Sequence, residues 1–168
     1  MTNEEAQKEN IRNQFIEDFY NGNCRYKHMP EELSDDYDIA LMVVESNPLE
    51  LENFIQEFKN SFSICQVALQ RDGRALEYVG DELIENMEIL TTAIYSHIQA
   101  LYFVPEKMLK NEEILNILEE YTDDLEFQKL FPDLYNEALY RKSAKEHEEN
   151  LSNKLVPKDN VVLKKPKI

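Results

Sequence analysis

A spacing of 25 residues between equivalent apolar side chains is the sequence feature that most constrains how this chain folds. Ile39, Ile64, Ile89 and Ile114 follow one another at this interval, and four further apolar columns keep the same step. Those columns are Leu33, Phe58, Leu83 and Met108; Val43, Ala68, Ala93 and Leu118; Leu51, Leu76 and Leu101; and Met29, Phe54, Val79 and Val104. Repeats of this length are typical of stacked units that bury their apolar faces against each other.

Polar residues recur with the same interval and indicate where helices begin. The first set consists of good N-cap residues: Asp36, Ser61, Asn86 and Asn111. Apolar residues at helical spacing follow each of them, which predicts a helix of about three turns. A second set predicts the start of a shorter helix, with His97 as the exception because it is a poor N-cap: Asn47, Asp72, His97 and Thr122.

These columns together predict an all-α solenoid of two-helix repeats, each about 25 residues long. We expect a degenerate unit at about 9–33, regular units at 34–58, 59–83 and 84–108, a lengthened unit at 109–134 and a polar capping helix at 135–153. Residues 1–153 are expected to form a single α-helical repeat domain. Residues 154–168 combine Lys with Pro and are expected to form a flexible tail.

The run ALEYVGDELIENMEILTTAI at 75–94 resembles a short helical repeat catalogued as domain of unknown function 4116. The residues that match its pattern are Ala75, Leu76, Tyr78, Leu83 and Glu88. Asn86 and Val79 stand where the family usually has Asp and Ala, and neighbouring units match more loosely, so the resemblance covers about residues 26–120. It implies tandem α-hairpins in proteins of microbes and their viruses. It implies no reaction, and therefore no catalytic residue is transferred.

Charge is distributed unevenly along the 168 residues, whose formal net charge is −16. Five Lys and one Asp give residues 154–168 a charge of +4, which leaves −20 on residues 1–153. An acidic body of this kind repels nucleic acid and anionic membranes and attracts basic proteins. Solubility alone is the alternative explanation. The basic tail is either a solvated end, or it binds the acidic body or an anionic partner.

Two acidic clusters and several tyrosines are the candidate partner-binding residues. The first cluster holds Asp35, Asp36 and Asp38, beside Glu31 and Glu32; the second holds Glu112, Glu113, Glu119, Glu120, Asp123 and Asp124, beside Glu126. No Lys or Arg lies between Asn111 and Glu126, so i,i+4 ion pairs cannot balance the second cluster. The aromatic candidates are Tyr95 and Tyr121, with Tyr37 and Tyr102. Solvated helix faces and tyrosines packed between hairpins are the structural alternatives.

Catalytic and metal-binding patterns are weak. Cys24 and His28 are four residues apart, but a structural zinc site needs four ligands and no second Cys/His pair stands nearby. Cys65 lies in an apolar run and is expected to be a core residue. The sequence has no Gly-rich phosphate loop and no nucleophile turn. We therefore expect no enzyme, no cofactor and no metal.

A non-catalytic acidic binding module fits these observations best. Its most concrete form is an inhibitor that masks the nucleic-acid-binding surface of a basic protein, such as a nuclease of a bacterial defence system. The alternative is a host-directed bacterial effector or adaptor that uses the solenoid as a scaffold. We expect a protein partner and no direct contact with nucleic acid or membrane. The absence of an evident signal peptide and the two Cys, expected to be reduced, favour a cytoplasmic location.

Overall fold

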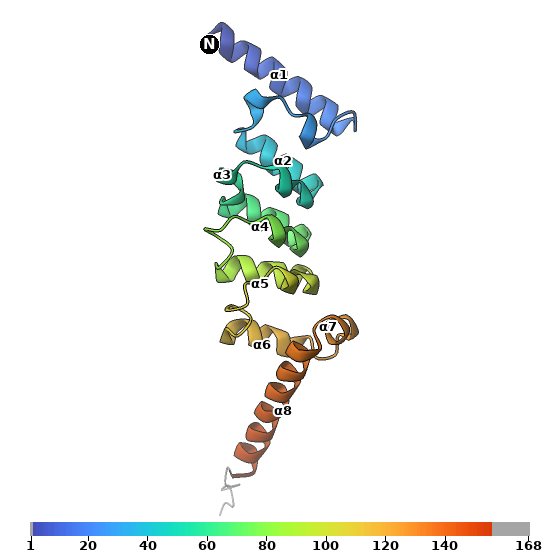
Figure 1. Ribbon diagram of the computed structural model, residues 1–168, viewed down its shortest axis with the longest axis vertical. Coiled ribbons are helices and arrows are strands. Elements are labelled where there is room, and N and C mark those ends of the chain that lie inside the picture. The colour runs from blue at the N-terminus through green and yellow to red at the C-terminus, as the bar shows by residue number, and fades with distance from the viewer. Residues whose placement is uncertain (1, 156–168) are drawn as a thin grey trace, which may run out of the picture. The chain divides into compact units, whose positions relative to one another are not determined.

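The described part of the protein is built from helices alone, as the sequence predicts (Figure 1). A computed structural model describes residues 2–155, with side chains up to residue 152. Two compact units divide the chain, residues 1–114 and 115–168, and the boundary lies within helix α6 (Glu112–Glu120). The expected single domain at 1–153 stays a prediction. Most of the expected tail, residues 156–168, lies outside the described residues.

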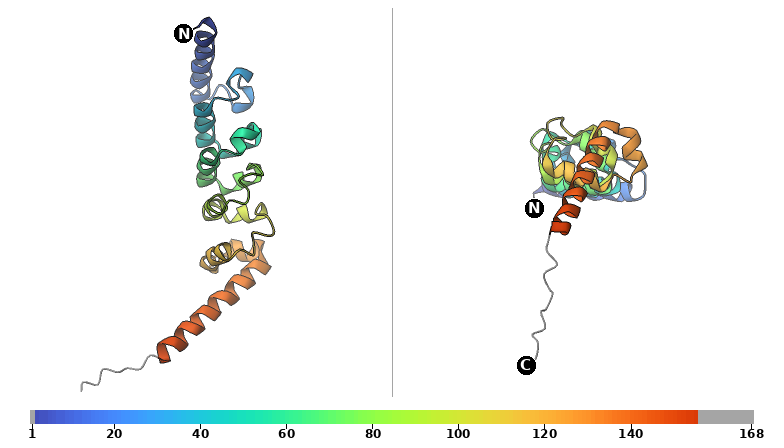
Figure 2. Two further views of the ribbon diagram at one scale, coloured as in Figure 1. Left: turned by 90° about the vertical axis from the view of Figure 1, so that its left-hand side faces the viewer. Right: turned by 90° about the horizontal axis from the view of Figure 1, so that it is seen from below.

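Stacked helical hairpins form most of the first unit. Its three regular α-helices lie side by side in chain order: α2 (Tyr37–Ser46), α4 (Phe62–Arg71) and α5 (Met87–Ser96) (Figure 1). Shorter 3-10 helices form a second row beside them (Figure 2): η3 (Pro48–Asn53), η4 (Gly73–Tyr78) and η5 (Ile98–Tyr102). The α-helices begin at residues 37, 62 and 87, and the 3-10 helices at residues 48, 73 and 98, so both rows keep the interval of 25.

Most members of the apolar columns form the core of this stack, whereas Met29, Leu83 and Met108 are half-buried. Ile39, Ile64, Ile89 and Ile114 are at most 1% exposed. Val43, Ala68 and Ala93 are fully buried, as are Leu51 and Leu76. Burial of each side chain of Val or Leu size contributes about 1.5–3 kcal/mol to the stability of the fold. Burial of the repeated core is therefore the main contribution that holds the hairpins together.

The N-caps of the α-helices are confirmed for three of the four positions. The side-chain oxygens of Asp36 and Asn86 accept from the backbone N–H of Ile39 (3.1 Å) and Ile89 (3.2 Å). Asn111 accepts from the N–H of Glu113 at 2.9 Å. Ser61 makes no such bond, although it occupies the equivalent N-cap position of α4.

The second helix of each of the three regular repeats is a 3-10 helix of five or six residues. Helix η3 contains Leu51 and ends at Asn53, and Phe54 follows it as C-cap. A 3-10 helix rises faster per residue than an α-helix and is favoured in short pieces. The second cap position is also only partly used as predicted: Asp72 accepts from the N–H of Arg74, whereas Asn47 and His97 cap no backbone N–H of their own helices.

The N-terminal end of the first unit differs from the regular repeats. Helix α1 (Asn3–Tyr20) begins well before the expected unit start at residue 9, because Thr2 and Glu5 form a capping box. Two short 3-10 helices, η1 (Tyr26–His28) and η2 (Glu31–Leu33), lead into α2. The four-residue helix α3 (Gln56–Lys59) occupies the connection that precedes α4.

The second unit contains α7 (Leu125–Leu130) and α8 (Pro132–Leu155), with most of α6. Fully buried Phe127 of α7 contacts the ring of Tyr135 on α8, with centroids 5.9 Å apart. Helix α8 is the capping helix that the sequence predicts at 135–153, and it begins three residues earlier, at Pro132. Proline suits the first position of a helix. No helix within the described residues is long and apolar enough to cross a bilayer.

Candidate protein-interaction surface

The connections before α2, α4, α5 and α6 place acidic side chains at equivalent positions of the first unit. Each connection contains a four-residue turn: PEEL at 30–33, IQEF at 55–58, GDEL at 80–83 and PEKM at 105–108. The last residue anchors the turn, and Leu33 and Phe58 are buried there. The two middle residues are exposed in every turn, and those that are acidic are Glu31, Glu32, Glu57, Asp81, Glu82 and Glu106. We call these six residues the acidic edge.

The carboxylates of the acidic edge are not neutralised by neighbours. Within the described part of the chain, none of the six accepts a side-chain hydrogen bond or forms an ion pair. In Figure 1 the connections before α4, α5 and α6 protrude on the same, left-hand side of the stack. Because packed helices lie about 8–10 Å apart, this edge presents exposed negative charge at roughly that interval.

The first acidic cluster predicted from sequence is partly paired with α1. Arg12 donates from Nε to Asp36 at 2.8 Å and from Nη2 to Asp38 at 3.3 Å. Lys8 contacts Asp35 at 3.3 Å. Asp36 also caps α2, which gives it a structural role. Asp35 and Asp38 stay exposed and belong to the same end of the unit as Glu31 and Glu32.

The second cluster contains residues with different roles. Glu119 is only 12% exposed and accepts from Arg141 Nε at 3.1 Å and Lys145 Nζ at 2.8 Å. Asp124 caps α7 by accepting from the N–H of Phe127 at 2.9 Å. The remaining predicted members are exposed: Glu112, Glu113, Glu120 and Asp123. The segment around Glu119 contains no Lys or Arg, and the cations that pair with Glu119 come from α8, more than twenty residues away in the chain.

The tyrosines named from sequence also divide into two groups. Tyr95 and Tyr102 are 53% and 59% exposed, and Tyr37 is 42% exposed although its ring contacts Phe58 with centroids 6.3 Å apart. Tyr121 is half-buried. The rings of Tyr95 and Tyr102 thus lie mostly at the surface, whereas Tyr121 is partly covered.

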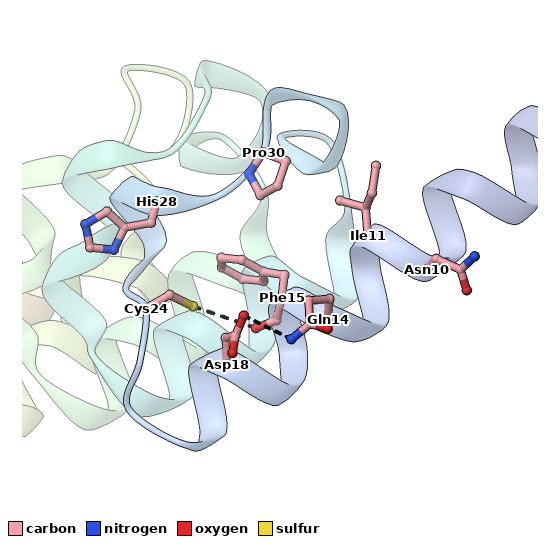
Figure 3. A pocket seen from close by; sticks show the side chains of 8 residues that line it. All are labelled: Asn10, Ile11, Gln14, Phe15, Asp18, Cys24, His28 and Pro30. Carbon is pink, nitrogen blue, oxygen red and sulfur yellow. Dashed lines mark hydrogen bonds between the residues drawn. The ribbon is translucent and has the colours of Figure 1, made fainter.

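An open groove of about 380 Å³ lies between α1 and the segment that follows it (Figure 3). Ile11 and Phe15 line it from the helix, and Cys24, His28 and Pro30 line it from the opposite side. The Cys24 thiol donates to the carbonyl oxygen of Phe15 over 3.7 Å. Burial raises the pKa of this thiol. His28 Nδ1 accepts from the N–H of Arg25, and no group of three or more metal-ligating side chains occurs among the described residues.

Sequence reasoning missed the acidic edge as a unit, although it included Glu31 and Glu32 in its first cluster. The apolar column of Leu33, Phe58, Leu83 and Met108 is recognised from sequence, and the two residues before each of its members carry the missed signal. An acidic residue at the same place in successive repeats is more informative than an acidic run along the chain, because stacking brings repeat-equivalent residues together.

The geometry defines a tandem helical-repeat protein with an acidic row on the first unit. Residues 38–84 and 63–110 match the family model described as Domain of unknown function (DUF4116). The two matched segments begin 25 residues apart, which equals the repeat interval. The resemblance predicted from residues 75–94 is therefore confirmed. No curated protein matches the chain significantly, and no solved structure does so either.

Proposed function

We propose that this protein is a non-catalytic acidic module that binds a basic protein partner. The observation that carries the proposal is the acidic edge, whose six carboxylates are exposed and form no ion pair within residues 2–152. A carboxylate that is already paired within its own chain gains little free energy when a partner covers it. An unpaired carboxylate retains its full attraction for a Lys or Arg of the partner.

The most concrete form of this function is inhibition of a protein that binds nucleic acid, such as a nuclease of a bacterial defence system. Carboxylates that recur along a rigid stack would stand where phosphates otherwise bind, and they would occupy the basic channel of the partner. The binding would be fast and would weaken with salt, because charge attraction between exposed groups is screened within about 8 Å at physiological ionic strength.

Charge reversal of the acidic edge tests this function. The edge variant combines Glu57→Lys, Asp81→Lys and Glu82→Lys. A control of identical net charge combines Glu137→Lys, Glu146→Lys and Glu149→Lys on α8, where all three residues are exposed. Each protein is used to capture partners from a bacterial lysate at low and high salt, with identification by mass spectrometry.

The unaltered chain and the α8 control should capture a basic nucleic-acid-binding protein at low salt and not at high salt. The edge variant should lose this capture. Added duplex DNA should displace the captured protein, since both ligands would share one basic surface. Equal capture by the edge variant, or a complex unaffected by DNA, would contradict the inhibitor proposal.

A host-directed effector or adaptor is the second candidate, and the exposed rings of Tyr95 and Tyr102 favour it. Such a protein would use an aromatic patch instead of the carboxylates. It should capture one partner that resists high salt. That capture should survive in the edge variant and fail in a variant with Tyr95→Ala and Tyr102→Ala.

A further inference from the structure

His97 connects two successive repeats of the first unit. It follows the last turn of α5, yet its ring contacts the start of η4 in the preceding repeat. The backbone N–H of Gly73 donates to His97 Nδ1 at 3.1 Å. Gly73 is the first residue of η4, where a backbone N–H has no acceptor within its own helix. A side chain of one repeat thus caps the short helix of its neighbour.

This hydrogen bond requires a neutral histidine. Nδ1 can accept from Gly73 only when it carries no proton, so the ring proton resides on Nε2. When Nδ1 gains a proton, two N–H donors face each other over 3.1 Å and the bond is lost. Protonation therefore removes a backbone cap that joins the two repeats.

A replacement acceptor already stands beside the ring. Asp72 Oδ1 lies 3.7 Å from His97 Nδ1, slightly beyond hydrogen-bond distance. Arg74 holds this carboxylate in place through Nε (2.9 Å to Oδ1) and Nη2 (2.6 Å to Oδ2). The bonds from Arg74 also lower the pKa of Asp72, so it remains charged when histidine titrates.

Few other charges face the ring. Arg71 ends α4, and Asp72 and Arg74 begin the next segment. Glu77 and Glu88 lie at the opposite ends of η4 and α5, and η5 carries no charged residue. The neutral contacts are Ser96, whose Oγ lies 3.0 Å from Nδ1, and the carbonyl oxygen of Gln70, which accepts from Ser96 Oγ at 3.4 Å. Asp72 is thus the carboxylate placed to accept a hydrogen bond from the protonated Nδ1 of His97.

We propose that His97 forms a proton-sensitive joint between the repeats at 59–83 and 84–108. The neutral ring accepts from the Gly73 N–H and caps η4. The protonated ring exchanges that bond for an ion pair with Asp72 and leaves the Gly73 N–H without this acceptor. Histidine is the side chain that commonly changes charge between pH 5 and 8.

Nuclear magnetic resonance of the full chain between pH 5 and 8.5 tests this joint. The Gly73 amide should shift with the same midpoint as the His97 ring, and its hydrogen exchange should accelerate at least about fivefold, beyond the intrinsic pH effect, in the protonated form. His28 is an internal control, because its Nδ1 accepts from the Arg25 N–H at 3.1 Å within a single segment. The Arg25 amide should follow His28 and not His97.

Two variants complete the test. His97→Gln offers a side-chain oxygen that accepts from Gly73 but does not titrate, so the Gly73 amide should stay protected across the range. Asp72→Asn removes the waiting carboxylate and should move the change of the Gly73 amide to lower pH, because the protonated ring loses its partner. A Gly73 amide that stays constant while His97 titrates, or that still titrates in His97→Gln, would overturn the proposal.

Discussion

Arg141 on α8 donates from Nε to Glu119 on α6 over 3.1 Å, although 22 residues separate them in the chain. Lys145, one helical turn further along α8, binds the other carboxylate oxygen at 2.8 Å. Burial alone would raise the pKa of Glu119, but the bonds from Lys145 and Arg141 prevail and hold it below its ordinary value of 4.5. Glu119, which the sequence analysis predicts to bind a partner, therefore stabilises the second unit.

Glu119→Gln should lower the free energy of unfolding by about 1 kcal/mol at pH 7, because it removes the charge of a mostly buried carboxylate that pairs with Arg141 and Lys145. The matched control is Glu120→Gln, since Glu120 is exposed and no ion pair binds it in the described structure. That control should change stability by less than about 0.3 kcal/mol. Urea unfolding followed by circular dichroism measures both.

The stability difference between Glu119→Gln and the unaltered chain should depend on pH in a defined direction. A folded-state pKa below the ordinary value means that Glu119 contributes stability above pH 4.5 and loses that contribution on acidification. The difference should therefore shrink as the pH falls below 4.5. A difference that is constant from pH 7 to pH 3 would show that charge pairing is not its cause.

Ile64→Ala should destabilise the first unit by about 2–5 kcal/mol, because it leaves a cavity at a fully buried position of the repeat core. Ile89→Ala should have a similar effect, since the two residues occupy equivalent positions. Leu125→Ala serves as the control, because Leu125 is 79% exposed. Chemical denaturation should rank the core variants far below this control; equal stability of all three would disprove the shared core.

The repeat interval made most of the first unit predictable. It located the apolar column of Ile39 and Ile64 and the starts of α2, α4 and α5, because caps and core positions are local requirements that recur with each unit. It did not distinguish a 3-10 helix from an α-helix in the second segment. A segment of five or six residues between a cap and an apolar anchor can form either type of helix. Packing against the neighbouring repeat determines which type forms.

The candidate surface was less predictable than the fold. A carboxylate's role depends on cations that are distant in sequence: Arg12 for Asp36, and Arg141 for Glu119. Nothing in an acidic run indicates that a helix more than twenty residues away will neutralise it. The acidic edge, in contrast, follows from the repeat itself, since its turns recur at the same interval as the core.

Gly73→Ala should destabilise the first unit by about 1–3 kcal/mol, because an added Cβ would overlap the carbonyl oxygen of Ala93. Gly22 offers a contrasting case: its φ is +73° and no atom lies within 4 Å of an added Cβ. Asn tolerates that backbone conformation, so Gly22→Asn should cost little and Gly73→Asn should cost at least as much as Gly73→Ala. Thermal unfolding compares the three variants, and a reversed order would contradict the close approach at Gly73.

The two cysteines should differ in reactivity toward a thiol reagent. Burial raises the pKa of the Cys65 thiol to about 12, and its Sγ lies 3.1 Å from the carbonyl oxygen of Lys59. Thiolate is the reactive species, so iodoacetamide at pH 8 should leave Cys65 unmodified in the folded chain. Half-buried Cys24 should react slowly, because burial also raises its pKa. Mass spectrometry of Cys24→Ser should therefore detect no adduct until denaturant is added; rapid labelling without denaturant would show that the Ile64–Cys65 core is open.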